Sequence, residues 1–543
     1  MEAATLDHVE EEPVARQKSV LSNLHTYAFI SRLPTETLQD IFIHCARDYH
    51  YQHLCPTGFV PSWVNVSYVC RHWRNVALKS PTLWAYLFII SRRWTKVLLA
   101  RSKQASLKIR VSLVPRQRLS CVGMVMKHVE RIQELCLRLP APFAHRVLSR
   151  LSSRAPRLQD LDITVEHPDS RVEGPSSLFD GDTPALRTLK LASCPVPLHS
   201  FRLSALTVLH LANVPVQFQQ DVEEFLAALS CMQDLKHLYL CHALPSAIGF
   251  LSSAVFKTFE KIDLTHLSRL WINAPLETTV TLLSCINIPL KTQVKLECNS
   301  ELNPSLDHYA LLRSLLAQRY NDQAQSNPTI LSLVIQSIWK GTSFTFSPRQ
   351  RYTTMAYGPW DRDILLYIHL DHRKIDGDTI INDICSSMPL SNVETLSVHQ
   401  PMFSPVFWRR ILRQLQDVRY ITLSGGNMPS LTDHTPHHSE GEDAQNHGGL
   451  ASGCQGQSHI LVPRLEELEL KHITFLPNDG SNLRESAITR DRLWATLSTR
   501  RLEGSRGRLT MTRCNIPGSG RFDMVAEWGG GGGCYAISGR EYT

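Results

Sequence analysis

The stretch RLQDLDITV, residues 157–165, determines the fold predicted for most of this chain. Leu158 is followed three residues later by Leu161, and aliphatic side chains then alternate through Ile163 and Val165. Strict alternation is typical of a short β-strand with one buried face. A strand of this length cannot bury that face by itself, so similar strands are expected elsewhere in the chain.

The pattern does recur. Copies occur as RIQELCLRL (131–139), ALRTLKLASC (185–194), ALTVLHLAN (205–213), DLKHLYLCH (234–242), HLSRLWINA (266–274), NVETLSVHQ (392–400), DVRYITLSG (417–425), RLEELELKH (464–472) and the weaker RLTMTRC (508–514). The first equivalent leucines lie 26, 28, 20, 29 and 32 residues apart, which is the spacing of leucine-rich repeats. We expect parallel neighbouring strands in one curved sheet. The side chains predicted to point inward are Leu135, Leu137, Leu161, Leu189, Leu191, Leu209, Leu211, Leu238, Leu240, Leu270, Leu468 and Leu470.

The intervals between these copies carry helical patterns. DVEEFLAAL (221–229) and SPVFWRRILRQL (404–415) each place apolar residues on one helical face. Segment 276–390 contains only three scattered candidate strands, TQVKLE, TILSLVI and DILLYIHL, and its role stays open. The predicted fold class is α/β: a small N-terminal helical module, followed by an irregular leucine-rich-repeat solenoid with a curved parallel sheet.

Three short helices are predicted before the repeats. RLPTETLQDIFIHCA (32–46) has a proline suited to the first helical position and then an apolar stripe of Leu38, Ile41, Phe42 and Cys45. PSWVNVSYVCRHWRNVALKSPTLW (61–84) forms a second stripe, and its Ser80-Pro81 pair suits the start of a third helix. A tyrosine- and histidine-rich stretch, predicted as a loop from Arg47 to Pro61, separates the two.

These residues resemble a known family. Leu33-Pro34, the first stripe, Val69-Cys70-x-x-Trp73 and Leu83-Trp84 look like the F-box, in particular the F-box-like form common in fungal proteins. The resemblance implies docking on a Skp-type linker, which bridges to cullin and RING subunits. The positions implied to form the docking surface or its support are Leu33, Pro34, Leu38, Ile41, Phe42, Val69, Cys70, Trp73, Leu83 and Trp84. About half of them should face the partner and half the interior.

The function implied is that of a substrate-recognition adaptor in an SCF-type ubiquitin ligase, with the repeats binding an unknown protein substrate. One alternative is a leucine-rich-repeat scaffold that binds proteins without engaging the ligase. It stays open because the predicted loop from Arg47 to Pro61 is longer than in the shortest F-boxes. A third reading is an unrecognised enzyme in segment 276–390.

Length and composition set further bounds. A chain of 543 residues exceeds one ordinary core, so several domains are expected. The predicted divisions are an N-terminal segment (1–30), the F-box-like module (31–90), the repeat array (91–425), a disordered insertion (426–459), the last repeats (460–520) and a flexible tail (521–543). The net charge of +7 is dispersed, which argues against nucleic-acid binding.

The predicted localisation is intracellular, either cytoplasmic or nuclear. No apolar run reaches the length of a membrane span, and the acidic N-terminus lacks the pattern of a signal peptide. None of the 14 cysteines forms a CxxC pair, so free thiols are expected rather than a zinc site.

No enzymatic activity, metal or cofactor is predicted. The sequence has no GxSxG elbow, phosphate-binding GxxxxGK[ST] loop or HExxH motif. His434, His437 and His438 lie in the predicted insertion, where no fourth ligand completes a metal site.

A candidate substrate site follows from the strand alternation. The middle residue of each aliphatic-x-aliphatic triplet should point away from the core, which selects Cys136, Asp162, Lys190, His210, Tyr239, Trp271, Thr422 and Glu469. Tyr239 and Trp271, flanked by Lys190 and His210, are the predicted substrate-binding residues, because aromatic anchors dominate binding hot spots. The alternative is that the segment after Trp271 covers its ring.

Overall fold

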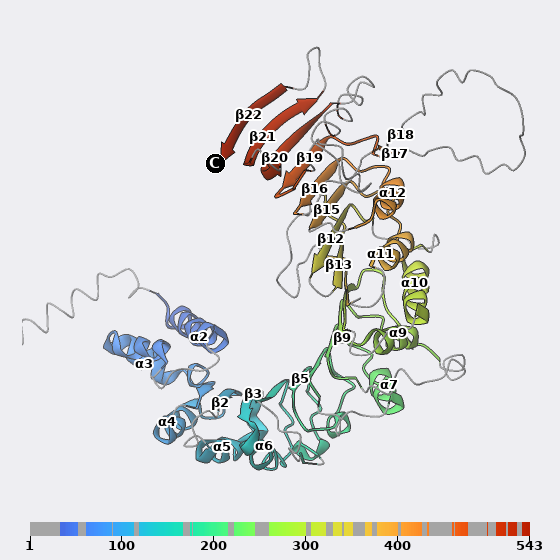
Figure 1. The fold of residues 1–543 in the computed structure, drawn as a ribbon. Helices are drawn as coiled ribbons and strands as arrows, with labels where there is room; N and C mark the ends of the chain where they lie inside the picture. Colours follow the sequence, from blue (N-terminus) through green and yellow to red (C-terminus); the bar gives the residue numbers. More distant parts are fainter. Residues whose placement is uncertain are drawn as a thin grey trace, which may run out of the picture. The chain divides into compact units, whose positions relative to one another are not determined.

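The computed structural model (Figure 1) describes residues 33–52, 61–89, 91–112, 119–166, 174–175, 177–214, 222–244, 260–299, 306–321, 329–338, 341–350, 364–371, 377–399, 403–425, 432–433, 459–460, 462–475, 493, 497, 506–516, 520–528 and 535–542. The chain divides into two compact units, residues 1–206 and 207–543. None of the described helices has the length and apolar character to cross a membrane.

The first unit begins with the predicted helical module. It comprises α2 (Thr35–Gln52), the 3-10 helix η2 (Ser62–Tyr68), α3 (Arg71–Lys79) and the 3-10 helix η3 (Leu83–Ala85), which leads into strand β1 (Tyr86–Phe88). The predicted second helix is thus split between η2 and α3. Cys70 causes the restart, because its Sγ accepts the backbone N–H of Trp73 at 3.4 Å and caps α3.

The first helix differs from the prediction in two ways. Its buried residues are Leu38, Phe42, Ala46 and His50, spaced four apart, whereas Ile41 and Cys45 are exposed. The predicted stripe was therefore too wide. The helix also continues to Gln52, so the first six residues of the loop predicted from Arg47 to Pro61 are helical.

Parallel strands follow the helices in the first unit. β1 pairs with β2 (Leu107–Ser112), and β3 (Ile132–Pro140), β4 (Asp160–Glu166) and β5 (Thr188–Ala192) continue in parallel. Helices α4 (Arg92–Ser102), α5 (Leu119–Met126) and α6 (Ala141–Leu148) lie in the connections from β1 to β4 (Figure 1). The end of the helical module therefore supplies the first strand of this sheet.

The second unit continues the α/β pattern. Its sheet runs in the order β6 (Val208–Ala212), β7 (His237–Cys241), β9 (Arg269–Ala274), β11 (Gln293–Cys298), β14 (Leu366–Asp371), β13 (Gly341–Ser347), β12 (Ser332–Ile338), β15 (Thr395–His399), β16 (Tyr420–Ser424), β19 (Glu467–Lys471), β20 (Gly507–Ile516), β21 (Gly520–Trp528) and β22 (Tyr535–Tyr542). Figure 1 shows α7 (Val222–Ser230), α9 (Leu276–Cys285), α10 (Leu306–Tyr320), α11 (Gly377–Ser386) and α12 (Pro405–Gln414) along one side of the strands. The opposite side of this sheet is called the open face below. In the first unit, the open face is the face of β2–β5 that carries the aligned residues Arg110, Cys136, Asp162 and Lys190.

The parallel arrangement departs from the prediction at two places. Among the described pairings of this unit's large sheet, those made by β13 are antiparallel, and so are the pairings of β21 with β20 and β22. The three candidate strands of segment 276–390 correspond to β11, β12 and β14, but β13 was not predicted. Because β13 reverses direction, β14 pairs with β11 and β12 pairs with β15.

The predicted inward leucines are buried. Each of the twelve has at most 4% of its surface exposed, from Leu135 at 1% to Leu470 at 0%. The result supports a parallel-rich α/β sheet, whereas the assignment to leucine-rich repeats stays a prediction.

The predicted tail carries structure. Residues 521–543 include most of β21 and all of β22, where a flexible end was expected. In β21, Met524, Ala526 and Trp528 alternate into the interior, so a strand signal was present beside the glycine run. In the predicted insertion 426–459, Thr432–Asp433 pairs with His459–Ile460, while His434, His437 and His438 lie outside the described residues.

Candidate functional site

Four of the ten predicted docking residues form the interior of the helical module. Leu38, Phe42, Leu83 and Trp84 are all 0% exposed. The indole Nε1 of Trp84 donates a hydrogen bond of 2.7 Å to the carbonyl of Ala77, which joins η3 to α3. These four side chains therefore hold the helices together and cannot themselves present a surface.

Three further predicted residues are half-buried. The Trp73 ring packs against Phe42 with 5.0 Å between centroids, Cys70 caps α3, and Leu33 precedes α2. Their contacts make them supports of the exposed surface as much as parts of it.

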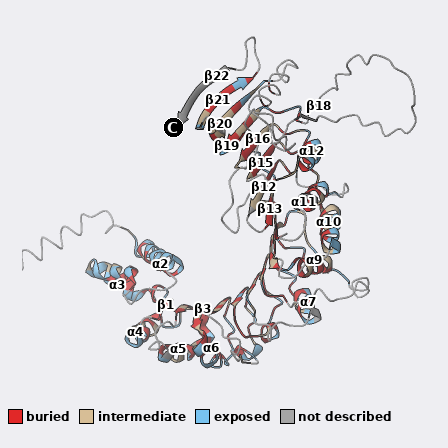
Figure 2. Ribbon diagram, viewed as in Figure 1, coloured by how far each residue is buried: buried red, intermediate tan, exposed pale blue. Residues whose placement is uncertain are grey.

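The remaining three predicted residues are exposed. Pro34 lies just before α2, while Ile41 and Val69 have 39% and 54% of their surface exposed. Figure 2 shows that α2 and α3 contain many exposed residues. Sequence reasoning missed Tyr68 and Leu78, which are 66% and 36% exposed.

Exposed apolar side chains are concentrated in this module. Of the eight large exposed hydrophobic residues in the described part of the chain, five lie between positions 41 and 78: Ile41, Tyr51, Tyr68, Val69 and Leu78. These residues are therefore candidates for contact with a partner protein.

The C-terminal end of α2 contacts the open face of the first strands. The Tyr51 hydroxyl donates to Oε2 of Glu134 at 2.7 Å, and the Lys108 ammonium pairs with the same carboxylate at 2.5 Å. Burial, together with Glu134, raises the pKa of Tyr51, so its hydroxyl keeps the proton that it donates. The module and strands β1–β3 are therefore connected within the first unit.

His50 lies inside this junction. It is 1% exposed, and its ring lies 5.0 Å from Phe88 and 5.5 Å from Tyr86, both on β1. Burial, with smaller contributions from Arg110 and Lys108, lowers the pKa of His50 to about 3. The imidazole is therefore neutral at physiological pH.

The second candidate site lies on the open face of the second unit. Strand register aligns His210 on β6 with Tyr239 on β7 and with Trp271 on β9. The ring centroids are 5.5 Å apart for His210 and Tyr239, and 6.4 Å apart for Tyr239 and Trp271. The structure thus brings together three of the four predicted substrate-binding residues. Lys190, the fourth, lies on β5 of the first unit and is exposed.

Sequence reasoning missed the continuation of this row. Lys295 on β11 lies over the Trp271 ring at 4.7 Å and over the Tyr367 ring of β14 at 5.2 Å. Glu297 pairs with Lys295 at 2.9 Å and accepts the Trp271 Nε1–H at 3.1 Å. The Trp271 ring is therefore held in place and remains partly exposed. Lys295 could have been found by extending the alternation rule to TQVKLE.

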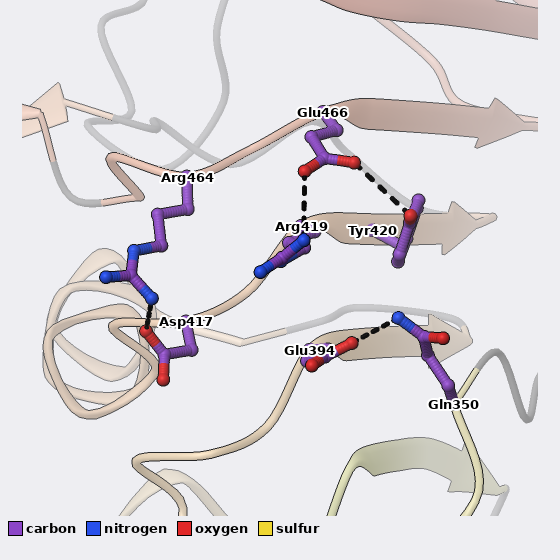
Figure 3. A network of polar contacts seen from close by, with 7 residues as sticks. All are labelled: Gln350, Glu394, Asp417, Arg419, Tyr420, Arg464 and Glu466. Carbon is purple, nitrogen blue, oxygen red and sulfur yellow. Dashed lines mark hydrogen bonds and ion pairs between the residues drawn. The ribbon is translucent and has the colours of Figure 1, made fainter.

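Farther along the second unit, a polar network joins successive strands near their beginnings (Figure 3). Arg419 pairs with Glu466 at 3.4 Å, and the Tyr420 hydroxyl donates to the same carboxylate at 3.2 Å. Arg464 pairs with Asp417, and Gln350 donates to Glu394. Exposed pairs of this kind contribute about 0–1 kcal/mol each to stability.

Comparison with known families identifies one domain. The model of the F-box-like family matches residues 30–90. This range covers α2, η2, α3, η3 and β1, and it contains all ten residues predicted from the resemblance. None of the curated proteins compared with the sequence matches it. The chain therefore contains an F-box-like domain.

Proposed function

We propose that this protein is a substrate-recognition adaptor of a cullin-RING ubiquitin ligase of the SCF type. Its F-box-like domain binds a Skp-type linker subunit, and its strands, as degenerate leucine-rich repeats, bind the protein to be ubiquitinated. The match of the F-box-like family to residues 30–90 carries this proposal, since F-box domains generally bind Skp-type linkers.

The burial of the ten predicted docking residues refines their roles. In the proposal, Pro34, Ile41 and Val69 contact the linker, together with Tyr68 and Leu78. Leu33, Cys70 and Trp73 support this surface from half-buried positions, and Leu38, Phe42, Leu83 and Trp84 act through the fold of the domain. Four of the ten residues are thus buried, three are half-buried and three are exposed.

The substrate site is assigned to the open face of the second unit. Tyr239 and Trp271 are partly exposed, aligned and held by neighbours, which keeps the entropy lost on binding small. Aromatic side chains with a polar end are frequent binding hot spots. His210 extends the row, and Lys190 remains a candidate on the first unit.

This role requires no catalytic residue in the chain. An adaptor raises the reaction rate by holding a substrate lysine near the activated ubiquitin, which increases the effective concentration of the reactants. The proposal therefore assigns neither a nucleophile nor a cofactor to this protein.

Co-purification tests the proposal directly. Tagged full-length protein, captured from its own cells, should carry a Skp-type subunit, a cullin and a RING protein, identified by mass spectrometry. The repeat-scaffold alternative predicts bound proteins without these three subunits. Capture of a folded chain that lacks the Skp-type subunit would therefore favour the scaffold and reject the adaptor.

A further inference from the structure

A cavity of about 170 Å³ lies on the open face of the first unit. The end of α2 forms one wall, through His50 and Tyr51, and strands β2 to β5 form the base. Five charged side chains from these strands line it: Arg110, Glu134, Asp160, Asp162 and Lys190. The cavity thus lies between the F-box-like domain and the strands that follow it.

Strand register sets the order of charge across the cavity. Arg110 on β2 is aligned with Cys136 on β3, which is aligned with Asp162 on β4 and then with Lys190 on β5. Asp160 lies two residues before Asp162, so both carboxylates are on the same face of β4. Two cations therefore flank a pair of carboxylates, with neighbouring strands about 4.8 Å apart.

Two carboxylates and one ammonium of this lining, those of Asp160, Asp162 and Lys190, differ from the carboxylate of Glu134 in their pairing among the described residues. Glu134 is neutralised by Lys108 and accepts the Tyr51 hydroxyl. Within the described part of the chain, no hydrogen bond or ion pair holds the carboxylates of Asp160 and Asp162 or the ammonium of Lys190. The two carboxylates are thus available to a ligand.

Two residues of the lining, His50 and Arg110, each carry a buried polar atom that is unsatisfied among the described residues. His50 is 1% exposed, and its Nδ1 has no hydrogen-bond partner among the described residues. Nη1 of Arg110 is buried and likewise has none there. Since buried polar atoms are nearly always hydrogen-bonded, two such atoms on residues that line one cavity point to a bound polar group. The Arg110 guanidinium can only donate, so this group must carry an acceptor.

We propose that the cavity binds a small zwitterion of the amino-acid type. Its ammonium group lies between Asp160 and Asp162, and its carboxylate or carbonyl oxygen accepts from Arg110. The cavity, at about 170 Å³, has room for about one amino-acid unit. The same chemistry is offered by a free amino acid and by the first residue of a polypeptide with an unmodified N-terminus. The proposal does not depend on ligase activity.

Calorimetry on the full-length protein tests the proposal with three ligand sets. These are the free amino acids, tripeptides with a free N-terminus, and the same tripeptides with an acetylated N-terminus. Members of the first or the second set should bind and raise the melting temperature, and the set that binds identifies the source. The acetylated peptides should not bind, because acetylation removes the ammonium charge.

Matched variants locate the site. Asp160→Asn/Asp162→Asn should weaken binding about tenfold or more, because it removes the charge that the ammonium requires. If the double variant does not fold, the single variant Asp162→Asn is measured in its place. Glu469→Gln changes an open-face carboxylate of the second unit and should bind like the wild type. Absence of binding in the first two sets, equal binding of acetylated peptides, or unchanged binding by the Asn variants would overturn the proposal. None of these results bears on the ligase role.

Discussion

The hydroxyl group of Tyr51, in the last turn of α2, donates a hydrogen bond of 2.7 Å to Oε2 of Glu134 on β3. The two residues are 83 positions apart in the chain. Arg110 lies over the Tyr51 ring at 5.3 Å and adds a contact from β2. Since α2 belongs to the F-box-like domain, this contact fixes the domain to the strands that follow it.

Removing the Tyr51 hydroxyl should destabilise the first unit. Tyr51→Phe is expected to lower the free energy of unfolding by about 1 kcal/mol, because a partly exposed hydrogen bond to a carboxylate is lost. Urea unfolding of the full-length protein measures the change. Tyr68→Phe, at a tyrosine with 66% exposure, is the control and should be neutral. Equal effects of the two substitutions would show that the Tyr51–Glu134 contact contributes nothing.

Charges placed on the exposed apolar surface should abolish binding to the Skp-type linker. Ile41→Asp/Val69→Asp should leave the fold intact, since both side chains are exposed, while each costs about 2 kcal/mol or more of binding free energy. Titration with the purified linker measures the affinity. Leu306→Asp, on α10 at 69% exposure, adds a charge at an exposed leucine outside the domain and should bind normally. Undiminished binding by the double variant would contradict the assigned surface.

Buried strand positions were predicted from the sequence more accurately than the topology of the sheet or the buried faces of the helices. The leucines from Leu135 to Leu470 were found because alternation reports burial directly. Strand β13, GTSFTFS, was missed because it has no leucine in the repeat position, and its antiparallel pairing depends on strands distant in sequence. On α2, the burial of His50 was missed because a search for apolar side chains does not find a buried histidine.

For the candidate sites too, local patterns in the sequence predicted some features and missed those that depend on contacts between distant residues. Tyr239 and Trp271 were predicted as neighbours because they occupy equivalent positions in consecutive repeats. The role of Glu297 could not be predicted, because it depends on how its carboxylate reaches Trp271 and Lys295. The cavity beside His50 likewise requires the packing of α2 against β2–β5, which no local pattern encodes.

Stability should fall in mild acid because of His50. Burial lowers its folded-state pKa to about 3, whereas an unfolded histidine titrates near 6.5. Between these values the unfolded chain binds more protons, so stability is complete above about pH 6.5 and decreases toward pH 3. Unfolding at pH 7.5 and 5.5 should show a smaller pH effect for His50→Phe than for the wild type. The exposed His145 is the control, and His145→Gln should keep the full pH effect. An unchanged pH effect in His50→Phe would contradict the assignment.

Substrate capture should depend on the aromatic row of the second unit. Tyr239 and Trp271 lie 6.4 Å apart on adjacent strands, and Glu297 holds the indole through a 3.1 Å hydrogen bond. Because both rings are partly exposed, Tyr239→Ala/Trp271→Ala should retain linker binding while losing about 2 kcal/mol or more of substrate affinity. Proteins captured by wild type and variant are compared by quantitative mass spectrometry, with the bound linker as the folding control. Tyr420→Ala removes a half-buried tyrosine from β16, outside the row, and should capture substrate normally. If the double variant captures the same proteins in the same amounts, the substrate site lies elsewhere on the chain, and Lys190 on the first unit becomes the next position to test.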